Sequence, residues 1–380
     1  MAGLNAGHAF DRFARWTPAA CALGALLVVA ISVWAVAANL GSGPQEPPAQ
    51  ADITPAGEPA EAVPGQGRDT DLQLYDAIAE RVAAGEDYHA VAVEEQRARD
   101  FPVTPGLAVR LPTLAHLTAA LGETGMGLAA VLLVIGLFVA WWRRLGEEPG
   151  GADRRPVALA LLAVGTLMGA KPEYLALHEV WAGLFLALSL ALHRPGRWIA
   201  AWLAAAAALA IREHALPFVL LLGALALWRR DWREFAAWAL LVMAFLAALW
   251  LHLAEVQQHV LASDRPSDPW LVLPGMAGLT EKIVASSVLH NLPAPLAGLL
   301  AVLPLLGWAG WKSELGRTAF LLFAGYAIFF MLAGRENNFY WALVVTPAWF
   351  VGYAFLPMAV KSLGPGAKRF RKQLGAQAQR

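Results

Sequence analysis

The stretch "EFAAWALLVMAFLAALWLHL", residues 234–253, decides the fold class of this chain. Only its first residue and one late histidine are strongly polar. A helix of this length extends about 30 Å, which is the thickness of the hydrocarbon core of a bilayer. The stretch therefore predicts a membrane-spanning helix.

The composition extends this prediction to the whole chain. It has 380 residues, of which 58% are hydrophobic and 15% charged, and its mean hydropathy is +0.49. Soluble domains carry about 25% charged residues. The formal net charge of zero gives no reason to expect a nucleic-acid partner. The lone Cys21 offers neither a disulfide framework nor a cysteine-based metal site.

Further apolar segments occur on both sides of 234–253. With it we count ten predicted spans: 17–39, 125–142, 157–170, 173–192, 198–211, 214–228, 234–253, 292–311, 318–333 and 339–360. Several of them are too short to stand alone in lipid, so they require neighbouring helices. The predicted fold class is an all-α polytopic transmembrane bundle of about ten spans, with an outer first loop that bears amphipathic surface helices.

The distribution of Lys and Arg predicts the orientation. If the N-terminus is cytoplasmic and the spans alternate, the inner segments hold 19 of the 29 basic residues, nearly all of them in short loops. This bias is typical of cytoplasmic loops. Both termini are therefore predicted to lie inside.

Five regions follow from this topology. They are a cytoplasmic N-terminus with the first span (1–40), a flexible tether rich in Pro, Gly and Ala (41–68), an outer loop with amphipathic or interfacial helices (69–124), the multi-span bundle (125–360) and a basic cytoplasmic tail (361–380). The first span has a second interpretation. Arg12, Arg15, an apolar core and "AVAA" (35–38) are also typical of a cleavable signal peptide.

Polar chemistry gathers on the predicted outer side. The densest cluster is "GRENNFYW" (334–341), which lies between two apolar runs. The turns "KPEY" (171–174) and "REHALP" (212–217) and the loop 254–291 face the same side. In the first outer loop, Leu74, Tyr75, Ile78 and Val82 occur at helical spacing, which predicts an amphipathic helix that ends near Gly85.

These features resemble the GT-C glycosyltransferases, polytopic enzymes that take sugars from polyprenyl-phosphate carriers at the outer membrane face. "DLQLYDAIAERVAAGEDY" (71–88) is similar to the first outer loop of that family. "GRENNFYWALVVTP" (334–347) resembles the polar turn before a late span in bacterial members. The resemblance covers the topology from about residue 17 to 360.

The resemblance implies an acid in the first outer loop that acts as general base or contacts a metal. That position is Asp71, with Asp69 as its competitor. A carboxylate is needed because an acceptor hydroxyl is a poor nucleophile until a base takes its proton. Acids in a first helical turn also favour the helix dipole, so a purely structural role for both stays open.

Cations are needed where the lipid phosphate departs. Arg335 is the first candidate, Arg212 the second and Lys171 the third, because each sits at an outer helix end. Snorkelling to the interface is the alternative role for Arg335 and Lys171. Beside Arg335, the side chains of Asn337, Asn338 and Tyr340 suit sugar hydroxyls.

Two further acids lie near this face. Glu179 falls below the predicted interface beside His178, and intramembrane acids are costly and usually functional. Glu213 lies at a break between two short spans. We predict a catalytic role for Glu179 and sugar- or acceptor-binding roles for Glu213, His178 and Tyr75; an ion pair of Glu213 with Arg212, or of Glu179 with Arg335, is the structural alternative. The sequence leaves open a divalent metal held by Asp71, Glu179 and a histidine, and it requires no other cofactor.

The predicted function is transfer of a sugar from a polyprenyl-phosphate donor to a lipid-linked or cell-envelope glycan. The expected partners are that donor, a glycan or glycolipid acceptor and membrane lipids. The expected location is the bacterial inner membrane, with the site facing outward. A transporter or lipid flippase, an O-antigen ligase or polymerase, and a non-catalytic assembly factor are the alternatives.

Overall fold

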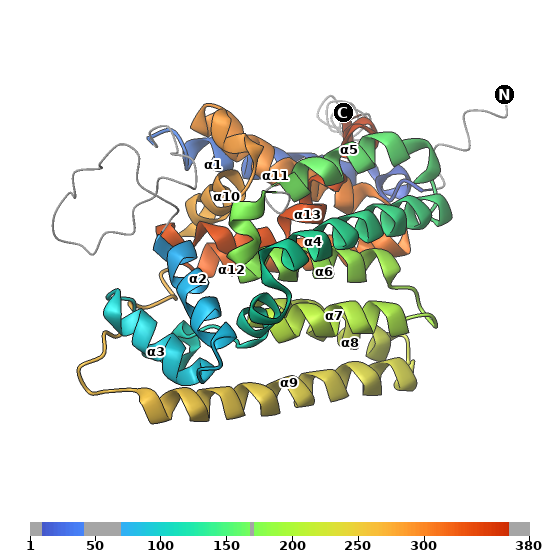
Figure 1. The fold of residues 1–380 in the computed structure, drawn as a ribbon. Coiled ribbons are helices and arrows are strands. Elements are labelled where there is room, and N and C mark those ends of the chain that lie inside the picture. The colour runs from blue at the N-terminus through green and yellow to red at the C-terminus, as the bar shows by residue number, and fades with distance from the viewer. Residues whose placement is uncertain (1–9, 42–69, 168–170, 365–380) are drawn as a thin grey trace, which may run out of the picture.

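The computed structural model describes residues 10–41, 70–167 and 171–364, and this part of the chain is helical (Figure 1). The α-helices are α1 Pro18–Ala37, α2 Thr70–Ala83, α3 Tyr88–Ala98, α4 Thr113–Glu147, α5 Arg155–Thr166, α6 His178–Leu192, α7 Ile199–Ile211, α8 Leu216–Trp228, α9 Trp232–His259, α10 Gly275–Ala285, α11 Ala294–Gly310, α12 Glu314–Leu332 and α13 Thr346–Trp349. Within the described ranges, the β-type contacts are two isolated bridges. The all-α class is confirmed. Asp69, the predicted tether beyond Gly41 and the tail after Gly364 lie outside the described residues.

Within the described ranges, four segments are long and apolar enough to cross a membrane: Pro18–Ala37, Gly106–Glu147, Trp232–His259 and Glu314–Leu332. A fifth results if Asn338–Val344 and Thr346–Gly364, which meet at a bend of 55°, form one broken span. Each of the ten predicted spans contains an apolar helix. However, α5, α6, α7, α8 and α11 are shorter than the roughly 20 residues that a lone span needs. The count of ten spans therefore remains a prediction.

The loops that the sequence predicts to face outward are more helical than expected. The loop 254–291 contains the last turns of α9 and all of α10. The predicted interfacial helix before the second span is continuous with it in α4, which changes direction at Gly122, where φ is +64°. A positive φ carries little strain for glycine, so the break occurs there.

The bent C-terminal segment packs in the middle of the bundle against α5, α6 and α11. Its backbone approaches the neighbouring helices at glycines. A Cβ on Gly183 of α6 would lie 2.1 Å from the carbonyl oxygen of Leu343, and one on Gly307 of α11 would lie 1.8 Å from that of Gly352. Small residues permit this backbone contact between membrane helices. The contact holds "GRENNFYW" at one end of the bundle.

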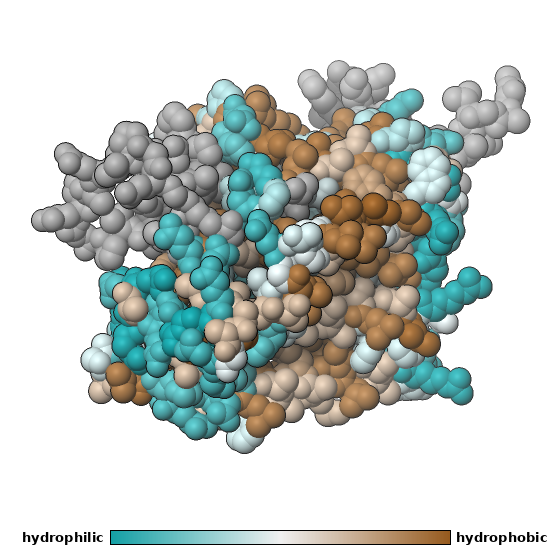
Figure 2. All heavy atoms as spheres, in the orientation of Figure 1, coloured by the Kyte–Doolittle hydropathy of each residue, from teal (hydrophilic) through white to brown (hydrophobic). Residues whose placement is uncertain are grey.

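Helices α2 and α3 form a lobe on that same end. Leu74, Ile78 and Val82 of α2 pack with Val91 of α3 in a small apolar cluster separate from the main core, which confirms the predicted amphipathic helix. The cluster also includes Val256 near the end of α9. Figure 2 shows hydrophilic side chains over this lobe and along the opposite edge, with a mostly hydrophobic band between them.

Candidate functional site

A pocket of about 1320 Å³ opens at the end of the bundle that carries the α2–α3 lobe. It is lined by α2, residues 99–110, the junction of α7 and α8, residues 265–274, α10 and the junction of α12 with "GRENNFYW". Segments from the first outer loop to the last span thus share one cavity. Among the predicted residues, Asp71, Tyr75, Arg212, Glu213, Arg335, Asn338 and Tyr340 line it.

Helix α2 contributes Asp71 and Tyr75. Asp71 lies in the first turn of the helix and is 8% exposed. Tyr75 follows one turn later, and its ring packs edge-on against His178 with 5.2 Å between centroids. Burial raises the pKa of the Tyr75 hydroxyl far above its usual value, and the neighbouring Arg110 offsets part of this effect. Tyr75 therefore stays protonated and keeps its O–H for a ligand.

Arg110 is a pocket residue that the sequence does not single out. Its Nε donates to the Tyr75 hydroxyl at 3.1 Å, and its Nη2 donates to the Tyr340 hydroxyl at 3.3 Å. Its carbonyl accepts a hydrogen bond from the Tyr88 hydroxyl of α3 at 2.7 Å, which fixes the backbone. No carboxylate of the described chain lies within ion-pairing distance of its guanidinium, and the residue lines the pocket. The pocket thus holds a cation whose charge is not balanced by contact.

Arg212 has a different environment. Its Nε lies 2.7 Å from Glu179 and its Nη1 lies 2.5 Å from Glu213. The side chains of Arg212 and Glu179 are buried, at 2% and 1% exposure. Because two carboxylates surround it, Arg212 has no net charge left for a phosphate. The predicted pair of Glu213 with Arg212 is confirmed.

The alternative pairing of Glu179 with Arg335 is wrong, because Arg335 lies elsewhere on the rim. Its Nη1 is 3.2 Å from Asp268, and its Nη2 is 3.5 Å from the Ser267 hydroxyl. Both partners belong to residues 260–274, which we call the strap. The strap also bonds to the bundle through Gly334 N and Trp270 O, at 2.8 Å. Arg335 therefore holds the strap against the pocket mouth.

The rest of "GRENNFYW" is built into the pocket wall. Asn338 accepts a hydrogen bond from Arg335 N at 3.1 Å, and its amide donates to the Tyr340 hydroxyl at 3.4 Å. The buried Lys282 of α10 donates to Gly334 O at 3.0 Å and fixes the start of the segment. The side chain of Asn337 is outside the described part of the chain.

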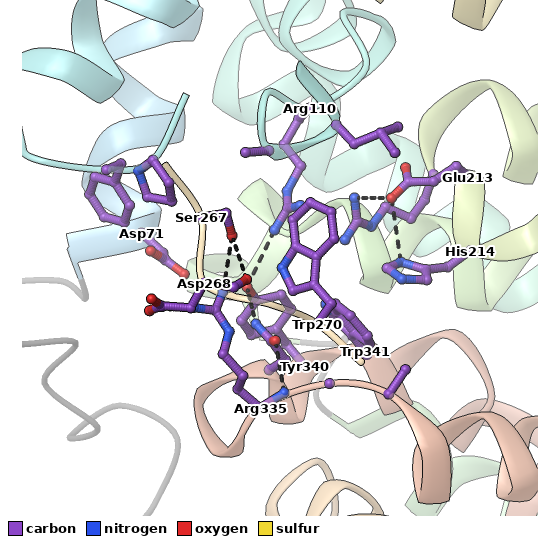
Figure 3. Close-up of a pocket in the computed structure, with 18 of the residues that line it drawn as sticks. Asp71, Arg110, Glu213, His214, Ser267, Asp268, Trp270, Arg335, Tyr340 and Trp341 are labelled. Carbon is purple, nitrogen blue, oxygen red and sulfur yellow. Dashed lines mark hydrogen bonds and ion pairs between the residues drawn. The ribbon is translucent and has the colours of Figure 1, made fainter. Parts of the chain in front are cut away.

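Figure 3 shows how these residues are distributed. Asp71, Asp268 and Arg335 lie on one side of the pocket, and Glu213 and His214 lie on the opposite side. The indoles of Trp270 and Trp341 lie between the two groups.

Three predicted residues do not reach the pocket lining. Lys171 points into solvent with 56% of its side chain exposed, 3.8 Å from Glu173. Glu179 lies behind Arg212, and His178 lies behind Tyr75. Glu179 and His178 therefore support Arg212 and Tyr75, which do line the pocket. The predicted metal set of Asp71, Glu179 and a histidine is not brought together: within the described ranges, no group of three or more His, Cys, Asp or Glu side chains could hold a metal ion.

The missed residues carry only weak sequence signals. Arg110 is a lone cation in "GLAVRLP" (106–112), just before a long helix. Asp268 and Trp270 belong to a loop with no periodicity, and Lys282 lies on a helix that the sequence analysis treated as loop. Their convergence depends on tertiary contacts.

No protein-family model matches this chain, and searches of curated proteins and of solved structures return no match either.

Proposed function

We propose that the chain is a membrane glycosyltransferase that moves a sugar from a polyprenyl-phosphate donor to a lipid-linked or cell-envelope glycan. The proposal includes ten spans, both termini in the cytoplasm, and a pocket that faces the exterior of a bacterial inner membrane. It is supported by the resemblance to the GT-C family and by the composition of the pocket.

One observation carries the proposal: Arg110 is a pocket cation that no carboxylate of the described chain neutralises by contact. A polyprenyl-phosphate donor has an apolar chain and an anionic linkage, so its site needs an apolar wall next to a cation that is not already neutralised. The pocket offers such a wall in Leu216, Pro217 and Leu220 of α8. Arginine matches phosphate oxygens through its planar fork. The two tyrosine hydroxyls orient the fork without cancelling its charge.

The chemistry needs one base and one stabilised leaving group. In the proposed reaction, an acceptor hydroxyl oxygen attacks the anomeric carbon, and the bond from that carbon to the phosphate oxygen breaks. Asp71 takes the hydroxyl proton, and the electron pair leaves with the lipid phosphate. Arg110 stabilises the negative charge on that phosphate, assisted by the Tyr75 and Tyr340 hydroxyls. Arg335 holds the strap and contributes at longer range.

The arrangement of charge supports the proposed orientation. Arg144 lies in the last turn of α4, and Arg194 and Arg229 follow the last turns of α6 and α8, at the end of the bundle away from the pocket, which the sequence predicts to be cytoplasmic. The pocket lies at helix ends, where a membrane lipid and a water-soluble glycan can both reach it. A transporter would need its site near the midplane.

Native mass spectrometry of the detergent-purified protein tests the proposal. Wild type is compared with Arg110→Ala and with Lys171→Ala, which removes a cation at the same end of the bundle but outside the pocket. We expect a bound polyprenyl-phosphate species in wild type and in Lys171→Ala, and its loss in Arg110→Ala. If wild type carries no such lipid even after one is added, the donor class is wrong and transport becomes the leading proposal.

A further inference from the structure

One side of the pocket is walled by aromatic rings. The ring of His214 lies 4.6 Å from that of Trp341, centroid to centroid. Phe329 stacks on Trp341 at 5.7 Å with an interplanar angle of 13°. Trp270 of the strap also lines the cavity here (Figure 3). Aromatic rings from three segments of the chain therefore form much of this wall.

Polar atoms are interleaved with these rings. One carboxylate oxygen of Glu213 is 2.5 Å from Arg212 and 3.7 Å from His214 Nδ1. Within the described chain, no hydrogen bond engages its other oxygen or the Nε2 atom of His214, and both residues line the cavity. A strong acceptor and an imidazole nitrogen therefore face the same space.

These polar atoms favour a sugar ring over an alkyl chain as the occupant of this side of the pocket. An alkyl chain packed here would strip water from the Glu213 oxygen and the His214 nitrogen without replacing its hydrogen bonds. Each loss of this kind costs about tenfold in affinity or more. A sugar ring avoids this penalty, because its C–H face can stack on an indole while its hydroxyls donate to Glu213 and His214. The alkyl chain has another wall in Leu216, Pro217 and Leu220, where Leu220 is 51% exposed on the outside of α8.

Asn338 and Tyr340 are less suited to the same task. The carbonyl oxygen of Asn338 is already bonded to Arg335 N, and its amide points to Tyr340. The Tyr340 hydroxyl in turn accepts from Arg110. Both side chains hold the pocket together and have few free hydrogen-bonding positions.

We infer that the Glu213–His214–Trp341 side of the pocket is a sugar-binding subsite, which accepts the hexose or pentose ring of the ligand. This inference rests on the proposed function and assigns a place within it: the phosphate lies at Arg110, the ring stacks at Trp341, and the lipid chain leaves along α8.

The test measures binding of defined probes to the full chain in lipid nanodiscs. The probes are farnesyl phosphate and farnesyl phosphates that carry glucose, mannose or arabinose. His214→Phe keeps an aromatic ring at this position and removes both ring nitrogens. His259→Phe is the matched control, because His259 lies at the end of α9 outside the pocket lining. His214→Gln keeps a hydrogen-bonding group in case the phenylalanine variant does not fold.

We expect at least one sugar-bearing probe to bind wild type more tightly than farnesyl phosphate does. His214→Phe should weaken that probe about tenfold and leave farnesyl phosphate unchanged, His214→Gln should retain part of the gain, and His259→Phe should change neither probe. Equal weakening of both probes by His214→Phe, or no weakening of either, overturns the subsite. The subsite is also overturned if wild type binds farnesyl phosphate and binds no sugar-bearing probe more tightly. If wild type fails to bind every probe, farnesyl phosphate included, the proposed function itself is rejected.

Discussion

The two ends of the helical bundle are both rich in charge, yet they use it differently. At the end away from the pocket, Glu234 is fully buried and has three partners: His193 at 2.8 Å, Arg229 at 2.9 Å and the Trp238 indole at 3.2 Å. At the pocket end, Arg110 contacts two neutral tyrosine hydroxyls and faces a cavity. The first arrangement closes a helix end, and the second leaves one charge available.

The difference indicates which charges belong to folding and which to a ligand. A buried ion whose charge is neutralised by ion-pair partners is costly to separate from them and has no charge available for a ligand. A buried ion held by neutral groups keeps its field, and the protein bears a desolvation cost that a bound counter-ion would relieve. Arg212 belongs to the first kind although it lines the pocket, and Arg110 belongs to the second.

The largest expected effect is on the reaction itself. Asp71→Asn removes the proposed base while keeping the size of the side chain. General base catalysis contributes about 10²–10⁴-fold, so we expect sugar transfer to fall by at least about a hundredfold. The measurement is a transfer assay on protein in vesicles, with expression and thermal unfolding as controls. Full activity in Asp71→Asn would move the base to Asp69, Glu213 or another acid.

At the opposite end, the expected effect is on stability alone. Glu234→Leu leaves the buried His193 without its carboxylate partner and removes the nearer of the two carboxylates that pair with Arg229. Removing one partner of a buried pair costs about 3–5 kcal/mol, so the melting temperature should fall clearly. The matched control is Glu147→Leu at the same end, whose pair with Arg194 is 2.5 Å long but has an exposed carboxylate; such pairs contribute about 0–1 kcal/mol. Thermal unfolding measures both variants. A loss of ligand affinity without a loss of stability in Glu234→Leu would remove the distinction between the two ends.

A smaller effect is expected from the groups that orient Arg110. Tyr75→Phe removes the acceptor of one hydrogen bond from the guanidinium. The net contribution of a hydrogen bond is about 0.5–1.5 kcal/mol. Affinity for farnesyl phosphate should therefore fall several-fold, with little change in melting temperature. Tyr353→Phe is a matched control, because its hydroxyl donates to Leu300 O in the core and it lies outside the pocket lining. Titration of the probe against each variant provides the measurement; equal affinities for wild type and Tyr75→Phe would show that the tyrosine does not orient Arg110.

The sequence predicted much of this arrangement because helix propensity and apolar periodicity are local. The helix of α2, with Tyr75 on its buried side and an end near Gly85, follows from spacing alone. The position of "GRENNFYW" at one end of the bundle follows from the run of apolar segments on either side of it. The order of these segments along the chain is therefore enough to assign Asp71 and Arg335 to one face.

The charge state of the pocket could not be predicted in the same way. Whether an arginine is neutralised depends on partners that are distant in the sequence. Arg212 meets Glu179 from α6, and Arg335 meets Asp268 from the strap. Arg110 has no such partner among the described residues, and nothing in its local sequence says so. From the sequence, Arg335 and Arg212 are the leading candidates for the phosphate-binding cation, and Arg110 is not among the candidates.

The α2–α3 lobe, which holds Arg110 in place, meets α9 at a histidine pair that we expect to make the stability of the lobe depend on pH. His89 Nε2 of α3 lies 3.2 Å from His252 Nδ1 of α9. Burial lowers the pKa of His89, with Asp87 and Glu255 opposing this effect and the nearby His259 and His116 adding to it. The folded state therefore favours neutral His89 at a pH where the unfolded chain, with a pKa of about 6.5, already binds a proton.

The smallest expected effect follows from that sign. The contribution of His89 to stability is undiminished above about pH 6.5 and decreases as the pH falls below that value. We expect amide exchange in α3, corrected for its intrinsic pH dependence, to accelerate between about pH 7.5 and 5.5, while exchange in α12 does not. His89→Gln should remove the acceleration, because glutamine keeps a hydrogen-bonding group but does not titrate. If α3 and α12 respond alike, acid acts on the whole bundle, and the α2–α3 lobe is not the weaker of the two regions.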